Sequence, residues 1–532
     1  MGGCVTSLHS RRFAFPSLDN LSKAGNVLSL RPIEWRGPLA ESYWPAVAMV
    51  LAALTPFLVL TSSIPPLSGL ISGDVGLGSS GMEMSAGMAD AAYCFGTILA
   101  VQLTARLPGR RLLVLYAAVF TLASLVTATA SSPAPFFIGR LVQGLTTSLM
   151  LITAAPALVL GFPTPRLRST AIVMNMGIFG AVAIGPVIGG AFAGLGDWRL
   201  LFWIATGVGA LALAMSFLTF SDMPPMDREV EFDFESLALA SIGCTAAFFG
   251  ASNLVAHSFT APIVLIPMAL GAACLVGLVA HQAYVKDPLM PVRQLGHTIP
   301  LAAIALAMSA GAGSVALVGL LQLTIEAHHL STALFWPELG GAVLTAVAFG
   351  YLLFTRYVPV LAFAGLLCLT ATALVLTGAG GGDTALIAIG TAGIGIGVGA
   401  AVAPGLFVAG FALPSPQLPR IFALVELLRG VAAFFTAPLL IHMAVTSGPD
   451  LASGVESATW VAFGLLLAGV AIVAAIVLSG GLRLQAPAID PWQEGEGPAI
   501  DSAPLGAALR RRLGGGGPQR VGAPEEYGPS DS

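Results

Sequence analysis

Residues 177–202, GIFGAVAIGPVIGGAFAGLGDWRLLF, form a segment long and apolar enough to cross a membrane as a helix. Its middle contains Gly185-Pro186 and Gly189-Gly190, although glycine costs about 1 kcal/mol and proline about 3 kcal/mol relative to alanine inside a helix. Small residues recur every four positions from Gly177, so they share one helix face. Small side chains allow membrane helices to approach closely, and Pro186 removes a backbone donor. The segment therefore predicts a bent, closely packed transmembrane helix.

The composition of the whole chain indicates an integral membrane protein. The chain has 532 residues, of which 56% are hydrophobic and only 9% are charged. Its mean hydropathy is +0.88. Soluble domains carry about 25% charged residues, so a soluble fold of this length would lack a polar surface. The net charge of -4 is less informative about this membrane protein than the positions of its charged residues.

Fourteen stretches are long enough to cross a bilayer core of about 30 Å as helices. They are residues 44–64, 84–104, 112–130, 135–160, 169–194, 199–220, 236–256, 261–284, 299–323, 331–354, 357–377, 384–411, 420–445 and 458–480. Transmembrane strands would alternate apolar and polar residues, whereas these stretches are continuously apolar. The predicted fold class is an all-α polytopic membrane protein with 14 transmembrane helices.

Lysine and arginine predict the orientation of the chain, because cytoplasmic loops are enriched in both. The loops after even-numbered stretches hold Arg106, Arg110, Arg111, Arg166, Arg168, Arg228, Lys286, Arg293, Arg356 and Arg420. The opposite loops hold only Arg199, and both ends of the chain are basic. Both termini are therefore predicted to be cytoplasmic. Residues 1–43 lack a signal-peptide pattern, and MGGCVT matches the N-myristoylation pattern by chance.

Two polar cytoplasmic stretches, SDMPPMDREVEFDFES and VKDPLMPVRQLGHTIP, divide the helices into six, two and six. The predicted parts are a cytoplasmic N-terminal tail (1–43), a six-helix bundle (44–220), two inserted helices with cytoplasmic loops (221–297), a second six-helix bundle (298–480) and a disordered cytoplasmic tail (481–532). The tail prediction rests on its Gly, Pro and charge content.

Enzymatic and metal sites are not predicted. The five cysteines are scattered without a CxxC, and His328-His329 lie beside Glu326 without a third ligand. The chain has no GxxxxGK[ST] phosphate loop, and its loops carry no nucleophile–base–acid set. We therefore expect no enzyme activity, no metal, no cofactor and no nucleic-acid partner.

Several motifs together resemble the major facilitator superfamily. The fifth stretch ends in GPVIGG and DWR, like the antiporter signature of that superfamily, and GRLVQG (139–144) resembles its fourth-helix arginine motif. The six-two-six plan, DPLMPVRQL (287–295) and LPRIFALVELLRG (418–430) match its fourteen-helix drug:proton antiporter type. The resemblance covers residues 44–480.

The resemblance implies two pseudo-symmetric six-helix bundles that rock around a midplane cavity. It implies proton-coupled export of amphipathic small molecules or drugs, with the proton gradient as the driving force. It also implies a monomer embedded in the lipid of the cell (inner or plasma) membrane, with a periplasmic adaptor only where the host has two membranes. Gly185, Pro186, Gly189 and Gly190 would then be a gating motif that contacts a helix of the other bundle; ordinary tight packing is the alternative.

Charged groups inside a membrane are expensive and mark candidate sites. Asp90 and Arg140 lie at similar depths from the outer side, so we expect them to interact or to share one water-filled cavity. Asp90 is either a proton carrier or half of a static ion pair. Gln143 and Asn175 are either substrate contacts or polar groups satisfied in the interior.

Three further charges lie in the second half of the chain. Glu338, after Pro337, is either a proton or substrate-cation site or a carboxylate capped by a free helix amide. Glu426 and Arg429 are three residues apart and share a helix face, which favours a local salt bridge over a role for Glu426 in proton coupling and for Arg429 at an interface.

The loop QLTARLPGRR (102–111) departs from the family pattern GxLaDrxGRR. Gly109, Arg110 and Arg111 match it, but Arg106 replaces the usual aspartate. Thr61 stands where this antiporter type often has an acid linked to proton coupling. One hypothesis is that Arg106 pairs with Glu426 as a swapped charge pair.

Two alternatives to proton-coupled export remain open. Thr61 and Arg106 favour an uncoupled facilitator or metabolite exporter. A transport-inactive membrane ligand sensor belongs to a different functional class, and retention of Arg140 and GPVIGG argues against it.

Overall fold

Helices make up the regular secondary structure of the computed structural model, which describes residues 37–219, 232–481 and 483–512. Fourteen helical segments are long and apolar enough to cross a membrane, which confirms the predicted number. The first seven segments are α1 (Tyr43–Val75), α2 (Ser79–Arg106), α3 (Gly109–Ala128), α4 (Pro133–Leu160), α5 (Thr164–Asn175) continued by the π-helical turn η1 (Met176–Gly180) and α6 (Ala181–Leu195), α7 (Trp198–Thr219), and α8 (Phe234–Ser252) continued by η2 (Asn253–Val255). The others are α9 (Pro262–Tyr284), α10 (Thr298–Ala327), α11 (Trp336–Leu352) preceded by η4 (Thr332–Phe335), α12 (Val358–Leu376), α13 (Thr384–Phe411), α14 (Leu418–Thr446) and α15 (Leu451–Gly480).

Several helices extend beyond the predicted apolar stretches. Helix α1 continues through Pro65 and Pro66 to Val75, and α15 begins at Leu451 rather than at 458. Backbone hydrogen bonds maintain a helix outside the hydrocarbon layer, where polar residues are tolerated. Apolar length therefore marks the membrane core and not the helix ends.

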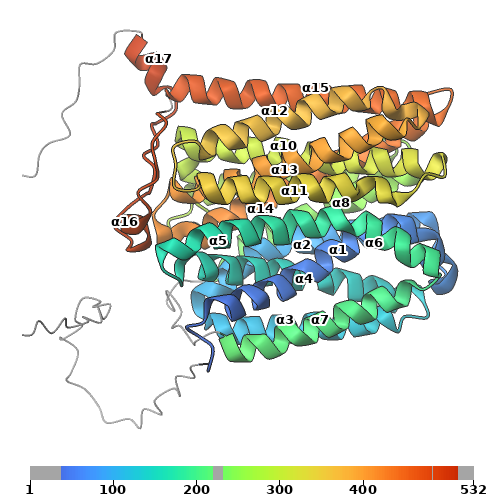
Figure 1. The fold of residues 1–532 in the computed structure, drawn as a ribbon, viewed down its shortest axis with the longest axis horizontal. Coiled ribbons are helices and arrows are strands. Elements are labelled where there is room, and N and C mark those ends of the chain that lie inside the picture. The colour runs from blue at the N-terminus through green and yellow to red at the C-terminus, as the bar shows by residue number, and fades with distance from the viewer. Residues whose placement is uncertain (1–36, 220–231, 482, 513–532) are drawn as a thin grey trace, which may run out of the picture. The chain divides into compact units, whose positions relative to one another are not determined.

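The spanning helices pack in two sets, α1–α7 and α10–α15, which occupy different parts of the view in Figure 1. The sets meet along two seams, one where α2 meets α14 and one where α5, η1 and α6 meet α11. The inserted α8 contacts α2 and α14, and α9 packs on α8. We call the face where α1 begins and α15 ends the terminal face, and the other the opposite face.

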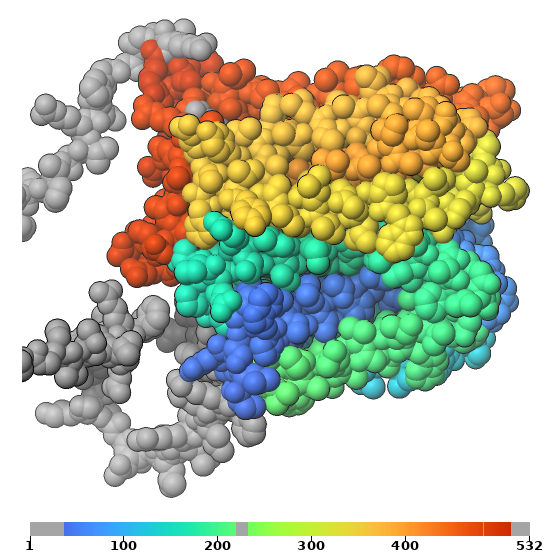
Figure 2. All heavy atoms as spheres, viewed as in Figure 1, coloured from blue at the N-terminus to red at the C-terminus, as the bar shows by residue number. Residues whose placement is uncertain are grey.

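The predicted disordered tail is wrong for residues 483–512, which have defined positions along the terminal face (Figures 1 and 2). Trp492, in the short helix α16 (Ile489–Gln493), is fully buried; its indole N–H donates to Leu413 O at 2.8 Å, and its ring meets Phe411 edge-on. Ile500 N donates to Phe411 O at 3.0 Å. The average composition of this segment predicted disorder because it does not reveal the effect of a single large apolar side chain, Trp492, that anchors the segment. Residues 513–532 and the tail prediction for 1–36 lie outside the described residues.

The same segment contacts both helix sets. Gln493 Nε2 donates to Val159 O at 3.0 Å and to Phe162 O at 3.4 Å, at the end of α4. The Thr164 hydroxyl at the start of α5 donates to Gln493 Oε1 at 2.8 Å. Beyond α16, Thr298 N of α10 donates to Ala503 O at 2.9 Å. Residues 489–503 therefore connect the α4–α5 connection with the second set.

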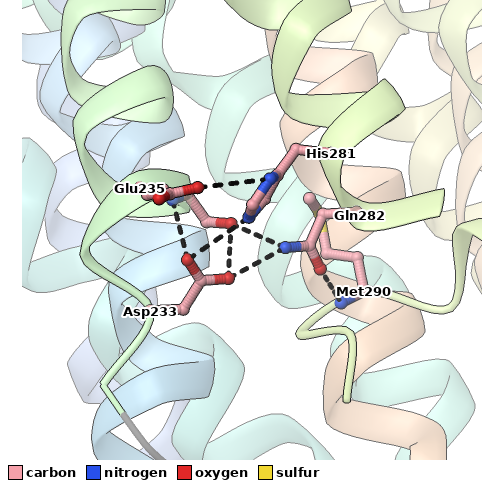
Figure 3. A network of polar contacts seen from close by, with 6 residues as sticks. Asp233, Glu235, His281, Gln282 and Met290 are labelled. Atoms are coloured by element: carbon pink, nitrogen blue, oxygen red, sulfur yellow. Dashed lines mark hydrogen bonds and ion pairs between the residues drawn. The ribbon is translucent and has the colours of Figure 1, made fainter. Parts of the chain in front are cut away.

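A polar network joins the terminal-face ends of α8 and α9 (Figure 3). Asp233 caps α8 by accepting from Ser236 N at 2.9 Å, and Gln282 of α9 donates to Asp233 Oδ2 at 3.1 Å and accepts from Met290 N at 3.0 Å. Partial burial raises the pKa of Asp233, but the hydrogen bonds from Ser236 and Gln282 and the nearby His281 outweigh this effect, so its pKa lies below the ordinary value. The network holds α8 and α9 together as a pair.

Replacing Trp492 with alanine should lower the free energy of unfolding by about 3 kcal/mol, because a large buried side chain is lost together with its hydrogen bond. The measurement is thermal unfolding of the purified protein in detergent. The matched control is Trp460→Ala in α15, whose side chain is 48% exposed. Equal shifts in the two variants would contradict the anchoring role of Trp492.

Replacing Asp233 with alanine should destabilise the protein by about 1 kcal/mol at neutral pH, through loss of a helix cap. Because the folded-state pKa is below the ordinary value of 3.8, this stabilisation is fully present above that value and is lost as the pH falls through the folded-state pKa. Unfolding temperatures of wild type and variant should therefore converge at low pH. Glu235→Ala, whose side chain is 81% exposed, should change little at any pH. A gap that persists at low pH would contradict this account.

Candidate functional site

A cavity of about 1010 Å³ lies between the two helix sets, in the half of the protein nearer the opposite face. Its walls come from the later part of α1, the early part of α2, η1, α11 and the last turns of α8, α10 and α14. The wall is mainly apolar and aromatic, with Phe57, Tyr93, Phe179, Phe248 and Phe434 among its residues. The cavity reaches exposed residues at the ends of α8 and α14, so it opens toward the opposite face.

Acidic side chains dominate the charge of the cavity wall. The acidic lining residues are Glu83, Asp90, Glu326, Glu338 and Glu426, and the only lysine or arginine among the lining residues is Arg429. Arg429 Nη2 lies 2.5 Å from Glu426 Oε2, so this pair is neutral as a unit. The other four carboxyl groups make no salt bridge among the described residues, and His257 and His442 also line the wall.

Asp90 lies in the middle of α2 and is 8% exposed. Among the described residues, its Oδ1 atom has no hydrogen-bond partner. The predicted partner Arg140 makes no ion pair with it within 4 Å in the described ranges. The two charges remain close enough to influence each other electrostatically. Asp90 therefore faces the cavity without a direct counter-ion.

Arg140 is fully buried behind the cavity wall and is held by neutral groups. It donates to Thr61 Oγ1 at 3.0 Å and to Gln143 Oε1 at 3.1 Å, and its guanidinium lies over the Phe57 ring, 5.1 Å from the centroid. Thr61 and Phe57 line the cavity. Gln143 Nε2 donates to Ser124 Oγ at 2.9 Å, which ties α4 to α3. At Thr61, where the resemblance implies an acid, the structure therefore has a hydroxyl that accepts from this arginine.

Glu338 occupies the first turn of α11 and is 3% exposed. Its Oε2 atom has no hydrogen-bond partner among the described residues. Its backbone packs against Gly395 of α13, where a Cβ atom would collide with Glu338 O. Glu338 therefore lines the cavity from the second set as Asp90 does from the first.

Glu426 forms the predicted local pair with Arg429 and also accepts a hydrogen bond from the Tyr93 hydroxyl at 3.3 Å. The hypothesis of an Arg106–Glu426 pair is wrong in this structure. Arg106 lies thirteen residues after Tyr93 on α2, which is about 20 Å along the helix axis. Its guanidinium contacts Gln102 and lies 4.8 Å from the centroid of the Phe232 ring.

The rest of the loop motif lies at the terminal face. Gly109, Arg110 and Arg111 form the first turn of α3. Arg110 Nη2 donates to Phe217 O of α7 at 3.1 Å. This loop is therefore remote from the cavity, which lies nearer the opposite face.

The glycines of the fifth span pack mainly within their own helix set, contrary to the predicted contact with the other bundle. A Cβ at Gly185 would collide with Ser62 of α1, and one at Gly189 with Ser63 O of α1. Two glycines of this span meet the other set: a Cβ at Gly190 would collide with Thr332 of η4, and one at Gly180 would lie 3.4 Å from the Leu339 side chain of α11. Pro186 lies within α6. The prediction that the small residues form one close-packing helix face is therefore correct. However, α1 covers most of this face, because α6 packs along α1.

Asn175 connects the two sets at the start of the π-helical turn. Its Nδ2 donates to Gly399 O of α13 at 3.0 Å, while its Oδ1 has no hydrogen-bond partner among the described residues. Single π-helical turns inside α-helices are frequent at functional sites. Here the turn lies where α5 and α6 meet α11.

Glu83, Glu326 and the inner face of α8 also line the cavity, although the sequence did not predict them as parts of the site. Glu83 is seven residues before Asp90, so both lie on one helix face, and this spacing was a usable signal. Helix α8 gave no such signal, because its cavity-lining residues are apolar or small.

Comparisons with known proteins agree with this architecture. The chain is 28% identical over 277 residues to the cephamycin export protein CmcT of Amycolatopsis lactamdurans, covering 51% of this chain and 57% of that protein. It is 31% identical over 186 residues to the multidrug resistance protein B homolog of Mycobacterium tuberculosis (strain ATCC 25618 / H37Rv), covering 35% of this chain and 34% of that protein. An uncharacterized MFS-type transporter, YhcA of Bacillus subtilis (strain 168), is 29% identical over 185 residues, or 34% of each chain. The matches therefore span between a third and somewhat more than half of these relatives.

Solved structures share the fold. A POT family transporter in complex with a thioalcohol-conjugated peptide aligns with a TM-score of 0.59 at 15% identity, over 81% of this chain and 96% of that one. The human organic anion transporter MFSD10 (TETRAN) aligns with a TM-score of 0.57 at 15% identity, over 81% and 99%. The family model described as Major Facilitator Superfamily matches residues 46–355. With this match, fourteen spanning helices and relatives that are transporters by name, the chain is a multi-pass membrane protein that belongs to the major facilitator superfamily.

Proposed function

We propose that this protein is a secondary transporter that exports amphipathic, positively charged small molecules in exchange for protons. The cavity carries the proposal: about 1010 Å³, mainly apolar walls, and more carboxyl groups than basic groups. Binding sites for drug-sized molecules have volumes of about 300–1,000 Å³ and a few placed polar groups. The names of the relatives support drug or antibiotic export, and their family supports a transporter rather than an enzyme.

Asp90 and Glu338 are the proposed coupling groups. Each is buried in the cavity wall, and each has a carboxyl oxygen without a hydrogen-bond partner among the described residues. Such a group is stabilised by taking up a proton or by binding a cation. If one carboxylate accepts either a proton or the cargo but not both, movement of one drives movement of the other in the opposite direction.

The proposed cycle alternates access between the two faces by rocking the helix sets against each other. In this structure the cavity faces the opposite face, while Asn175–Gly399 and the contact of Gly350 with Ile172 close the half near the terminal face. The distribution of basic residues favours a cytoplasmic terminal face. On that orientation, the structure corresponds to the outward-facing state in the proposed cycle.

One observation favours a second candidate, an uncoupled facilitator. Arg140 donates to the neutral hydroxyl of Thr61 rather than to an acid. A transporter that lacks this acid must couple through another carboxyl group or not at all. The two candidates predict opposite results in a single transport experiment.

In proteoliposomes with an imposed pH gradient, wild-type transport of ethidium should follow the gradient. Asp90→Asn and Glu338→Gln should each reduce gradient-driven flux by at least roughly tenfold, because the carboxyl group that exchanges a proton for cargo is lost. The measurement is the initial rate of dye movement with and without the gradient. Glu456→Gln, which changes an exposed glutamate of α15, is the matched control.

Equal flux with and without the gradient in the wild type would establish the facilitator. Retained coupling in both variants would remove Asp90 and Glu338 from the mechanism. Dye binding without flux under any gradient would favour a ligand sensor.

A further inference from the structure

We propose that the inserted helix α8 is a wall of the cargo cavity and that Phe248 selects cargo with a planar aromatic part. This inference deepens the proposed function, because it concerns the ligand of the same cavity. Its basis is the position of α8 relative to the two helix sets and the residues that it contributes to the cavity.

Helix α8 closes one of the two seams between the sets. It contacts both α2 and α14, while α9 packs on its outer side and is largely exposed. The contact with α2 is close, because a Cβ at Gly87 would collide with Ser252 Oγ. On the other side, His442 Nδ1 of α14 lies 2.7 Å from Leu254 O at the end of α8. The inserted pair is therefore oriented with α8 inward.

The inward side of α8 reaches the cavity. Phe248, Ala251 and Ser252 are buried and line it. Positions three and four residues apart on a helix share a face, so these residues form one continuous strip of wall. At the terminal-face end, the Asp233–Gln282 network holds α8 against α9 and fixes this rotation of the helix (Figure 3).

Phe248 forms one of two aromatic pairs in the wall. Its ring centroid lies 5.8 Å from that of Phe434 on α14, and Phe57 and Tyr93 of the first set stack with centroids 6.0 Å apart. All four residues line the cavity, which also contains Asp90. Two aromatic pairs near a carboxylate suit a flat aromatic cation, which gains ring contacts and charge neutralisation together.

The test measures binding of ethidium to the purified full-length protein in detergent by fluorescence. Phe248→Leu keeps an apolar side chain but removes the ring, so the affinity should fall by roughly three- to tenfold, in line with the contribution of one aromatic contact. Phe248→Tyr keeps the ring and should stay within about twofold of the wild type. Phe234→Leu is the same substitution on the same helix at a side chain that is 72% exposed, and it should have no effect.

A second measurement tests the wall itself. Ser252→Cys should be modified by a charged methanethiosulfonate reagent above the wild-type level, and ethidium should slow the reaction. Ile242→Cys, at a 49% exposed position of α8 away from the cavity lining, should not react above that level. Charged reagents enter an aqueous cavity but not the lipid.

Several outcomes would overturn the inference. Equal affinities of wild type and Phe248→Leu, absence of ethidium binding to the wild type, or a Ser252→Cys variant no more reactive than Ile242→Cys would each do so. Failure of the proposed function has a different signature: ethidium binding and its dependence on Phe248 would persist, while gradient-driven flux would be absent.

Discussion

Close approach of helix backbones at glycine is the constraint on which this structure depends. Lipid provides no hydrophobic drive for helices to associate, so van der Waals contact across small residues must supply it. A Cβ at Gly144 of α4 would collide with Ala89 O of α2, and one at Gly395 of α13 would collide with Glu338 O of α11. These two contacts lie at or beside the two carboxyl groups of the cavity, because Asp90 follows Ala89 directly. The same packing that holds the helices together therefore positions the groups proposed to couple transport.

The balance of charge in the interior follows from where the hydrogen bonds of Arg140 go. Its bonds go to Thr61 and Gln143, and its guanidinium lies over an aromatic ring, so in the described part of the chain it has no acid within ion-pair distance. Asp90 is thereby left facing the cavity. In contrast, Glu426 and Arg429 neutralise each other within one turn of α14. Arg140 thus connects helices, and Arg429 neutralises Glu426. The remaining carboxyl groups give the cavity its acidic character.

The fourteen helices could be predicted because the requirement for an apolar stretch of fixed length is local to each segment. The partners of those helices could not. The spacing of Gly185 and Gly189 shows that some helix approaches closely, but only the three-dimensional path of α6 shows that it is α1. The Arg106–Glu426 hypothesis failed because Glu426 lies level with Tyr93, about 20 Å along α2 from Arg106, and which levels of α2 and α14 meet depends on how the two helices pack. The Glu426–Arg429 pair was predictable, because both residues lie on the same helix.

In the segment after α15, two neighbouring residues bind the two helix sets, so their contacts depend on the distance between the sets. The Trp492 indole is bonded to Leu413 O of the second set, and the next side chain, Gln493, is bonded to Val159 O of the first. A hydrogen bond of this kind tolerates stretching of only about half an ångström before it weakens sharply. The α16 turn therefore fixes the distance between Leu413 and Val159. If that distance increases, either the Trp492 or the Gln493 hydrogen bond must break.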